Sequence, residues 1–189
     1  MSDLLAAYGL AIAEHWTVWL VTIVLVLAAV IDGFELKVPN WITFPFIISG
    51  WVYSVCAFGL EGLGWSLLGT VIGLALLLPM YAIGGMGAGD VKLLAGVGAW
   101  VYGIHTLYAF SATAVVGAVL AVLMVLCRNT WKKHSSQFWL ILNEIMVIRD
   151  PEQLAQIAAK RKPSMLLLPY GIPIAIGTIG YFLWTGMLV

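Results

Sequence analysis

Charged residues are scarce in this chain. Only 10% of its 189 residues are Asp, Glu, Lys or Arg, whereas a soluble domain has about 25%. Nine basic and nine acidic residues cancel to a formal net charge of zero, which argues against nucleic acid as a partner. Hydrophobic residues reach 62%, more than a globular fold of this size can bury. The composition therefore predicts a membrane protein, with lipid covering much of its surface.

Residues that hold metals or form redox pairs are also few. The two cysteines, Cys56 and Cys127, form no C-x-x-C pair, which argues against a zinc ribbon or a redox dithiol. The histidines His15, His105 and His134 lack the spacing of metal ligands. We therefore expect neither a metal nor a cofactor. The first fifteen residues contain no Lys or Arg, so we expect no cleavable signal peptide.

Long uncharged runs divide the chain into membrane spans. A helical span needs about 20 apolar residues, and the run from Leu93 to Cys127 is too long for one, so we divide it near Gly103 and His105. We expect a single-domain, all-α membrane protein (1–189) with six transmembrane helices. The expected spans are 16–34, 41–60, 64–84, 91–104, 106–127 and 165–187. A count of five spans, with one long tilted helix, stays open.

The segment 128–164 is the polar part of the chain and indicates the orientation. Seven of the nine basic residues lie between Arg128 and Lys162, which predicts that this segment is cytoplasmic. Its apolar spacing predicts two short amphipathic helices that contact membrane lipid. With six spans, Lys37 and Lys92 fall on the same side, and the N-terminus falls in the periplasm. An amphipathic lead-in is expected over residues 1–15.

Two aspartates occupy the positions where chemistry is expected. Asp32 ends the first span and Asp90 follows the third, both on the predicted cytoplasmic side. Ionisable residues at a membrane are candidates for function. Neighbouring carboxylates share a proton, so one acts as a base and the other as an acid. Such a pair can hydrolyse a peptide bond through an activated water. The alternative for each residue alone is an interfacial charge at a helix end.

Glycines surround the second aspartate. Gly84, Gly85, Gly87 and Gly89 precede Asp90, and they leave room for a peptide backbone to approach the carboxylate. A plain flexible turn is the alternative. The loop contains no phosphate-binding G-x-x-x-x-G-K-[ST] pattern. A separate G-x-x-x-G pattern, from Gly69 to Gly73, predicts close helix packing without a functional role.

Three segments resemble the signatures of the prepilin peptidase family. Gly87-Ala-Gly-Asp-Val-Lys matches the G-x-G-D motif of intramembrane aspartyl peptidases. Asp32, followed by Val38-Pro39-Asn40, is similar to the family's first catalytic segment, with Val in place of Ile. Pro169-Tyr-Gly171 resembles its third signature. The resemblance implies that Asp32 and Asp90 are catalytic. It also implies cleavage of a short leader from pilin precursors, at the cytoplasmic face of the bacterial inner membrane.

The resemblance also suggests which family type this is. Larger members carry an N-terminal domain with paired cysteines, and many also methylate the new pilin N-terminus. This chain looks like the shorter, peptidase-only type of the tight-adherence (Flp) pili, so we expect no methyl transfer. The expected partner is a pilin precursor, through its leader and the adjoining hydrophobic helix.

Several nearby residues could shape the site or approach the substrate. Lys37 and Lys92 could bind or steer a substrate, or instead extend towards lipid phosphates. Pro39 and Asn40 are expected to turn the chain into the second span or to contact substrate. The candidates from the third signature are Pro169 and Gly171.

Two other classes of function remain open from the residues. A small proton- or cation-coupled transporter could use the same two aspartates as a relay. A non-catalytic subunit of a pilus or secretion machine is the other alternative. A relay aspartate usually lies near the middle of a helix, whereas Asp32 and Asp90 lie at helix ends beside glycines. The sequence therefore favours the peptidase, and it does not indicate an oligomeric state.

Overall fold

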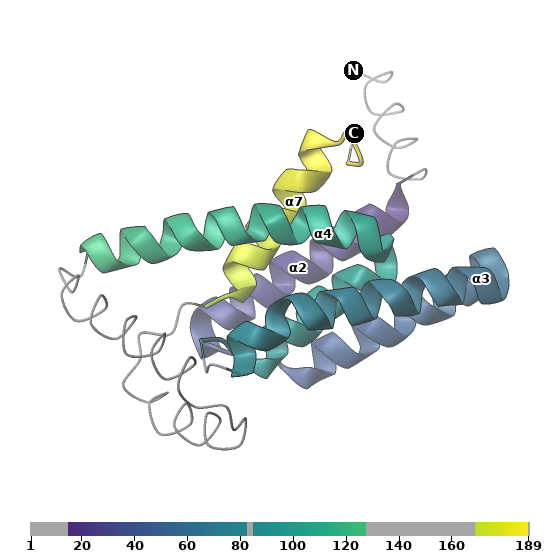
Figure 1. Cartoon of the computed structure of the whole chain (residues 1–189), viewed down its shortest axis with the longest axis horizontal. Helices are drawn as coiled ribbons and strands as arrows, with labels where there is room; N and C mark the ends of the chain where they lie inside the picture. The colour runs from purple at the N-terminus through teal and green to yellow at the C-terminus, as the bar shows by residue number, and fades with distance from the viewer. Residues whose placement is uncertain (1–14, 83–84, 128–168, 189) are drawn as a thin grey trace.

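A computed structural model describes residues 15–82, 85–127 and 169–188. These residues form four helices, α2 (Trp16–Glu35), α3 (Asn40–Ala82), α4 (Ala88–Cys127) and α7 (Gly171–Trp184), and the described part contains no strand (Figure 1). The all-helical prediction is therefore confirmed for this part. The predicted lead-in at 1–15 lies almost wholly outside the described residues. So do the amphipathic helices of 128–164 and the start of the last span.

Helices α3 and α4 are each interrupted once. Helix α3 folds back on itself as a hairpin (Figure 1). Gly59, at the kink inside α3, has φ 66° and ψ −154°, a combination that only glycine adopts readily. Tyr102 in α4 has φ 63° and ψ 178°. The break in α4 therefore lies immediately before Gly103, where we divided the long apolar run. The six span boundaries themselves stay a prediction.

Small residues bring α3 and α4 into close contact. A Cβ added to Gly69 would collide with the backbone of Gly98, and one added to Gly73 would lie 2.6 Å from the Leu94 carbonyl oxygen. Ser66 Oγ, one turn before Gly69, donates a hydrogen bond of 2.6 Å to the Ala99 carbonyl. The prediction that this G-x-x-x-G pattern serves helix packing is confirmed.

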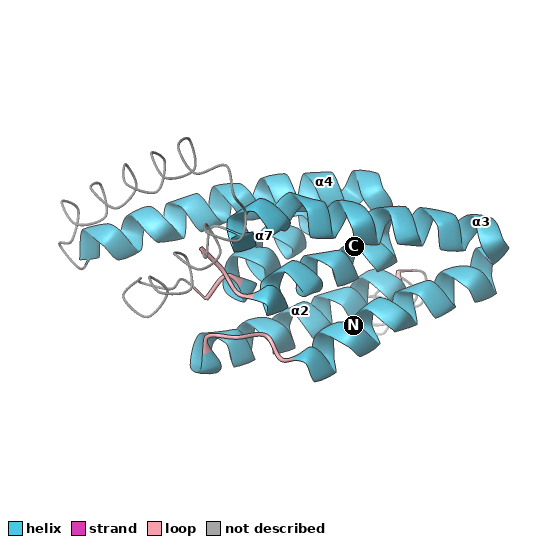
Figure 2. Ribbon diagram, turned by 60° about the horizontal axis from the view of Figure 1, so that its bottom comes forward, coloured by secondary structure: helices cyan, strands magenta, loops and turns pink. Residues whose placement is uncertain are grey.

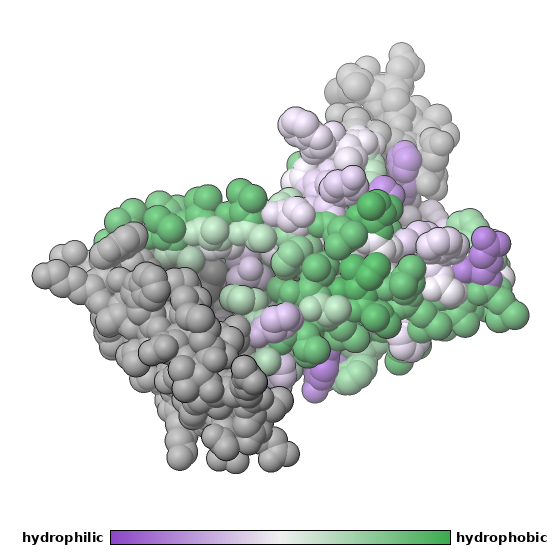
Figure 3. Space-filling view, viewed as in Figure 1, coloured by the Kyte–Doolittle hydropathy of each residue, from purple (hydrophilic) through white to green (hydrophobic). Residues whose placement is uncertain are grey.

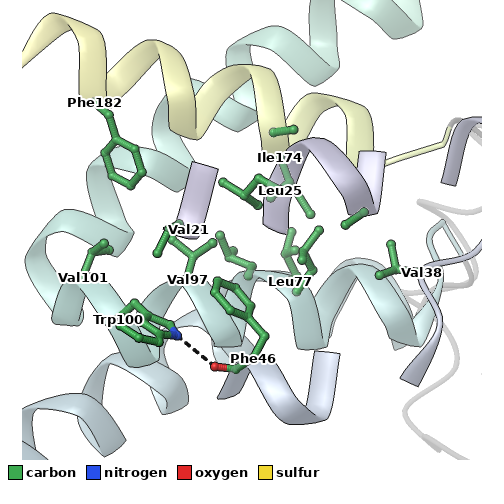
Figure 4. Packing of buried hydrophobic residues seen from close by; sticks show 14 of the residues in the cluster. Val21, Leu25, Val38, Phe46, Leu77, Val97, Trp100, Val101, Ile174 and Phe182 are labelled. Carbon is green, nitrogen blue, oxygen red and sulfur yellow. Dashed lines mark hydrogen bonds between the residues drawn. The ribbon is translucent and has the colours of Figure 1, made fainter. Parts of the chain in front are cut away.

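The first half of α4 lies at the centre of the core. Its buried side chains meet α2, α3 and α7 (Figure 4). Trp100 on α4 donates a 2.9 Å hydrogen bond from Nε1 to the Phe46 carbonyl of α3. The labelled apolar contacts include Val21 and Leu25 from α2, Val97 from α4, and Ile174 and Phe182 from α7.

The outer surface is largely apolar. Leu, Ile, Val and Phe side chains of all four helices are exposed, and the face in Figure 3 is predominantly hydrophobic. Three helices, α2, α3 and α4, are long and apolar enough to cross a membrane, whereas α7 has only 14 residues. Both properties fit the membrane protein that the composition predicted.

Candidate functional site

The three motif-bearing segments lie at the same end of the helix bundle. The turn between α2 and α3, the glycine turn before α4 and the turn into α7 all lie towards this end (Figure 2). They come from residues 36–39, 85–87 and 169–170, which are far apart in sequence. The contacts described below join these segments to one another.

Asp32 lies in the last turn of α2 and is only 1% exposed. Its Oδ2 accepts a hydrogen bond of 2.7 Å from the backbone N–H of Gly171, at the start of α7. A Cβ at position 171 would lie 2.9 Å from the same oxygen and 3.0 Å from the Cβ of Asp32. Gly171 therefore both orients the carboxylate and lets α7 approach it.

Asp90 lies in the first turn of α4 and is 4% exposed. Its Oδ2 accepts a 3.0 Å hydrogen bond from the backbone N–H of Gly87, the residue before the helix. An acidic residue at the third helical position commonly caps the helix in this way, and its charge lies at the positive end of the helix dipole. A Cβ at Gly87 would lie 3.2 Å from Oδ2. Helix formation itself therefore orients this carboxylate.

The second glycine of the motif fits against the first signature. A Cβ at Gly89 would collide with the carbonyl oxygen of Val38, which is buried in the turn after α2. The start of α4 is therefore in direct contact with the backbone of Val38. Two sequence signatures that lie about fifty residues apart form one contact, and a side chain at position 89 would separate them.

Lys92 forms a second connection between the start of α4 and the segment that follows α2. Its Nζ donates a 2.9 Å hydrogen bond to Oδ1 of Asn40 and lies 4.6 Å from the centre of the Phe44 ring. It thus joins the start of α4 to the start of α3. Lys37 is different, because its Nζ lies 3.7 Å from Oε2 of Glu35 and both side chains are more than half exposed. The structure gives Lys37 no described contact with either aspartate.

The two prolines start helices. The carbonyl of Pro39 accepts a hydrogen bond of 3.1 Å from the Ile42 N–H at the start of α3. The carbonyl of Pro169 accepts one of 3.2 Å from the Ile172 N–H at the start of α7. Both prolines are half-buried and form turns beside the aspartates. Pro39 therefore lies in the turn into α3, and a contact of Pro39 or Asn40 with substrate stays a prediction.

Tyr170 links the turn into α7 to α4, and we did not select it as a site residue from the sequence. It directly precedes Gly171, the hydrogen-bond donor to Asp32. Its hydroxyl lies 3.1 Å from the position of a Cβ on Gly117 of α4. The third signature included this tyrosine, but no spacing in the sequence indicated its contact with α4.

This arrangement suits acid–base chemistry. Each aspartate is buried, and each receives a hydrogen bond on Oδ2 from a backbone N–H that is fixed by the start of a helix. Carboxyl groups that are held in this way are suited to take up and release protons at a fixed position. All ten predicted site residues lie in or next to these turns, and the described ion pair of Lys37 is with Glu35 on the exposed surface.

Comparison with known proteins identifies relatives. Residues 19–122, more than half of the chain, match the model of the Type IV leader peptidase family. The chain is 29% identical over 133 residues to a prepilin leader peptidase/N-methyltransferase of Aeromonas hydrophila, covering 65% of this chain and 46% of the relative. It is 31% identical over 117 residues to the protein of that name from Aeromonas salmonicida, covering 58% and 40%.

The chain therefore spans less than half the length of these curated relatives. No solved structure matches it. The family match includes both aspartates and the turn from Lys37 to Asn40, but it ends before the turn into α7. The chain belongs to the Type IV leader peptidase family.

Proposed function

We propose that this protein is a membrane aspartyl endopeptidase that removes the leader peptide from pilin-like precursors. The observation that carries the proposal is a pair of buried aspartates, each bound on Oδ2 by a backbone N–H at the start of a helix, beside turns at the same end of the bundle. The names of the relatives supply the substrate class.

In the proposed reaction, the ionised carboxylate of one aspartate removes a proton from a water molecule. The water oxygen attacks the scissile carbonyl carbon, and the protonated carboxyl of the other aspartate donates its proton to the carbonyl oxygen. Collapse of the tetrahedral intermediate breaks the C–N bond. The departing amine takes the proton from the first aspartate, and the second aspartate recovers its proton from the hydroxyl that becomes the new carbonyl oxygen. The pair then returns to its singly protonated state, with no covalent enzyme intermediate.

We further propose six membrane spans, with the aspartates facing the cytoplasm and the N-terminus in the periplasm of a bacterial inner membrane. The interruptions at Gly59 and Tyr102 support this count, because they divide α3 and α4 into halves. The hydrogen bond between Lys92 and Asn40 places one of the basic residues at the aspartate end. The excess of Lys and Arg in 128–164 favours the cytoplasm for that end.

Peptidase activity without methyl transfer is also part of the proposal. The relatives are named for both activities. The segment that matches the family contains the two aspartates, which suit hydrolysis. Mass spectrometry of the cleaved product tests this point, since a methylated N-terminus is about 14 Da heavier and would contradict it.

Co-expression with a pilin precursor tests the central proposal. We expect the parent protein to cleave the precursor and both Asp32→Asn and Asp90→Asn to leave it uncleaved. Glu35→Gln is the matched control, because Glu35 lies three residues from Asp32 on an exposed surface and should retain cleavage. Equal amounts of each variant in the membrane fraction would show that folding is intact. Full cleavage by either aspartate variant would contradict the paired mechanism.

A further inference from the structure

An apolar groove runs between α2 and α7. It has a volume of about 470 Å³ and is open along one side. One wall is a single face of α2, with residues at helical spacing, and the other is a single face of α7. The wall of α2 consists of Val26, Ala29, Val30, Gly33 and Phe34, and the wall of α7 of Ile172, Ala175, Ile176 and Ile179.

The groove adjoins the aspartate site. Helices α2 and α7 are in contact at Gly33 and Ile172, because a Cβ added to Gly33 would lie 3.6 Å from Cδ1 of Ile172. Gly33 follows Asp32 in the chain, and Ile172 follows Gly171, the residue whose N–H binds the Asp32 carboxylate. Asp32 itself is buried and does not line the groove, so the groove ends one residue from Asp32 on α2 and one residue from Gly171 on α7.

The chemistry of the groove limits what can occupy it. Every lining residue is apolar or glycine, so an occupant finds no hydrogen-bonding side chain there. A peptide in such surroundings must satisfy its backbone internally, which requires a helix. Small residues at Ala29, Gly33 and Ala175 allow another helix to approach closely. The nine residues from Val26 to Phe34 span about 12 Å, two helical turns or slightly more.

We propose that this groove, the α2–α7 groove, binds the apolar helix of the substrate that follows the scissile bond. The inference rests on the proposed function and adds where the membrane-embedded part of the precursor docks. The helix lies against α2 and α7, and its N-terminal end presents the scissile bond to Asp32. The groove therefore contributes substrate affinity, whereas the aspartates carry out hydrolysis.

Two neighbouring tryptophan substitutions test the inference. Val26 lines the groove and Leu27 does not, although their side chains are similarly exposed, at 49% and 46%. Each variant is assayed with the full precursor and with a soluble peptide that contains the same scissile bond but no apolar segment. We expect Val26→Trp to raise KM for the precursor by about tenfold, or about 1.4 kcal/mol. Its kcat, and cleavage of the peptide, should stay within about twofold, as should both activities of Leu27→Trp.

The other outcomes are equally informative. Equal effects of Val26→Trp on both substrates, or no effect on either, would overturn the groove proposal while leaving the peptidase intact. A parent protein that cleaves neither substrate would instead refute the proposed function. The two failures are therefore distinguishable.

Photo-crosslinking provides a second measurement that does not depend on tolerance of a bulky side chain. A photoreactive residue is placed at Val26, at Ile176 or at the control position Leu27, in an Asp90→Asn background that retains uncleaved precursor. Crosslinks from Val26 and Ile176 to the precursor helix, and none from Leu27, are expected. Crosslinks from the groove positions only to lipid, to the chain itself or to a second copy would overturn the proposal.

Discussion

Gly171→Ala is the most informative single substitution at the site. The added Cβ would lie 2.9 Å from Oδ2 of Asp32, 3.0 Å from its Cβ and 3.2 Å from its Cγ. Ordinary van der Waals contacts of a Cβ atom begin near 3.4 Å, so the Asp32 carboxylate and the start of α7 must move apart by about 0.5 Å. The hydrogen bond from the Gly171 N–H is 2.7 Å long and would lengthen towards the limit of about 3.2 Å.

A displacement of this size has a large effect on a reaction and a smaller one on folding. A misplacement of about 1 Å can lower a rate by about 10²-fold, so we expect a loss in kcat of about 10- to 100-fold. Overpacking costs about 1–3 kcal/mol of stability. The matched control is Gly180→Ala, on the same helix, where an added Cβ meets nothing within 4 Å. The assay is precursor cleavage by equal amounts of purified variants in lipid vesicles. Equal kcat for Gly171→Ala and Gly180→Ala would refute the assigned role of Gly171.

Three further substitutions test how the site is assembled. Gly89→Ala should abolish precursor cleavage, because its Cβ collides with the Val38 carbonyl; full cleavage would contradict the contact. Gly59→Ala should lower the unfolding free energy by about 1–3 kcal/mol, because position 59 has a positive φ that alanine adopts poorly. Gly64→Ala is the control, because an added Cβ at this helical position meets nothing within 4 Å, and it should be neutral or stabilising. Equal thermal unfolding of these two variants would contradict that expectation. Lys92→Met should destabilise the fold by about 1 kcal/mol and lower cleavage only in proportion. Abolished cleavage at unchanged stability would instead show that Lys92 acts on substrate.

The sequence was sufficient to predict the all-helical class and the residues around the aspartates. Apolar runs interrupted by charges reflect the length of a membrane span, so the starts of α2 and α3 were predicted to within a residue. The need for a break followed from the length of the apolar run, and Gly103 and His105 near its middle indicated the position. The break itself falls on Tyr102, whose left-handed φ is unusual for a non-glycine residue and could not be predicted from its identity.

Other features of the site depend on tertiary contacts. The sequence indicated that Gly89 and Gly171 shape the site, but their specific neighbours, Val38 and Asp32, come from segments that are distant in the chain. The contact of the Tyr170 hydroxyl with the Gly117 position depends in the same way on how α7 packs against α4. The α2–α7 groove has no signature in the sequence, because its residues resemble any lipid-facing helix surface.

The central claim is that Asp32 and Asp90 act together in a single chemical step. The most direct measurement compares kcat/KM of the purified parent, Asp32→Asn, Asp90→Asn and the double variant, with the cleaved bond identified by mass spectrometry. Residues that act as a unit show non-additive losses. We therefore predict that each single variant falls to background and that the double variant falls no further. Substantial activity in either single variant, or losses that multiply in the double variant, would contradict the account.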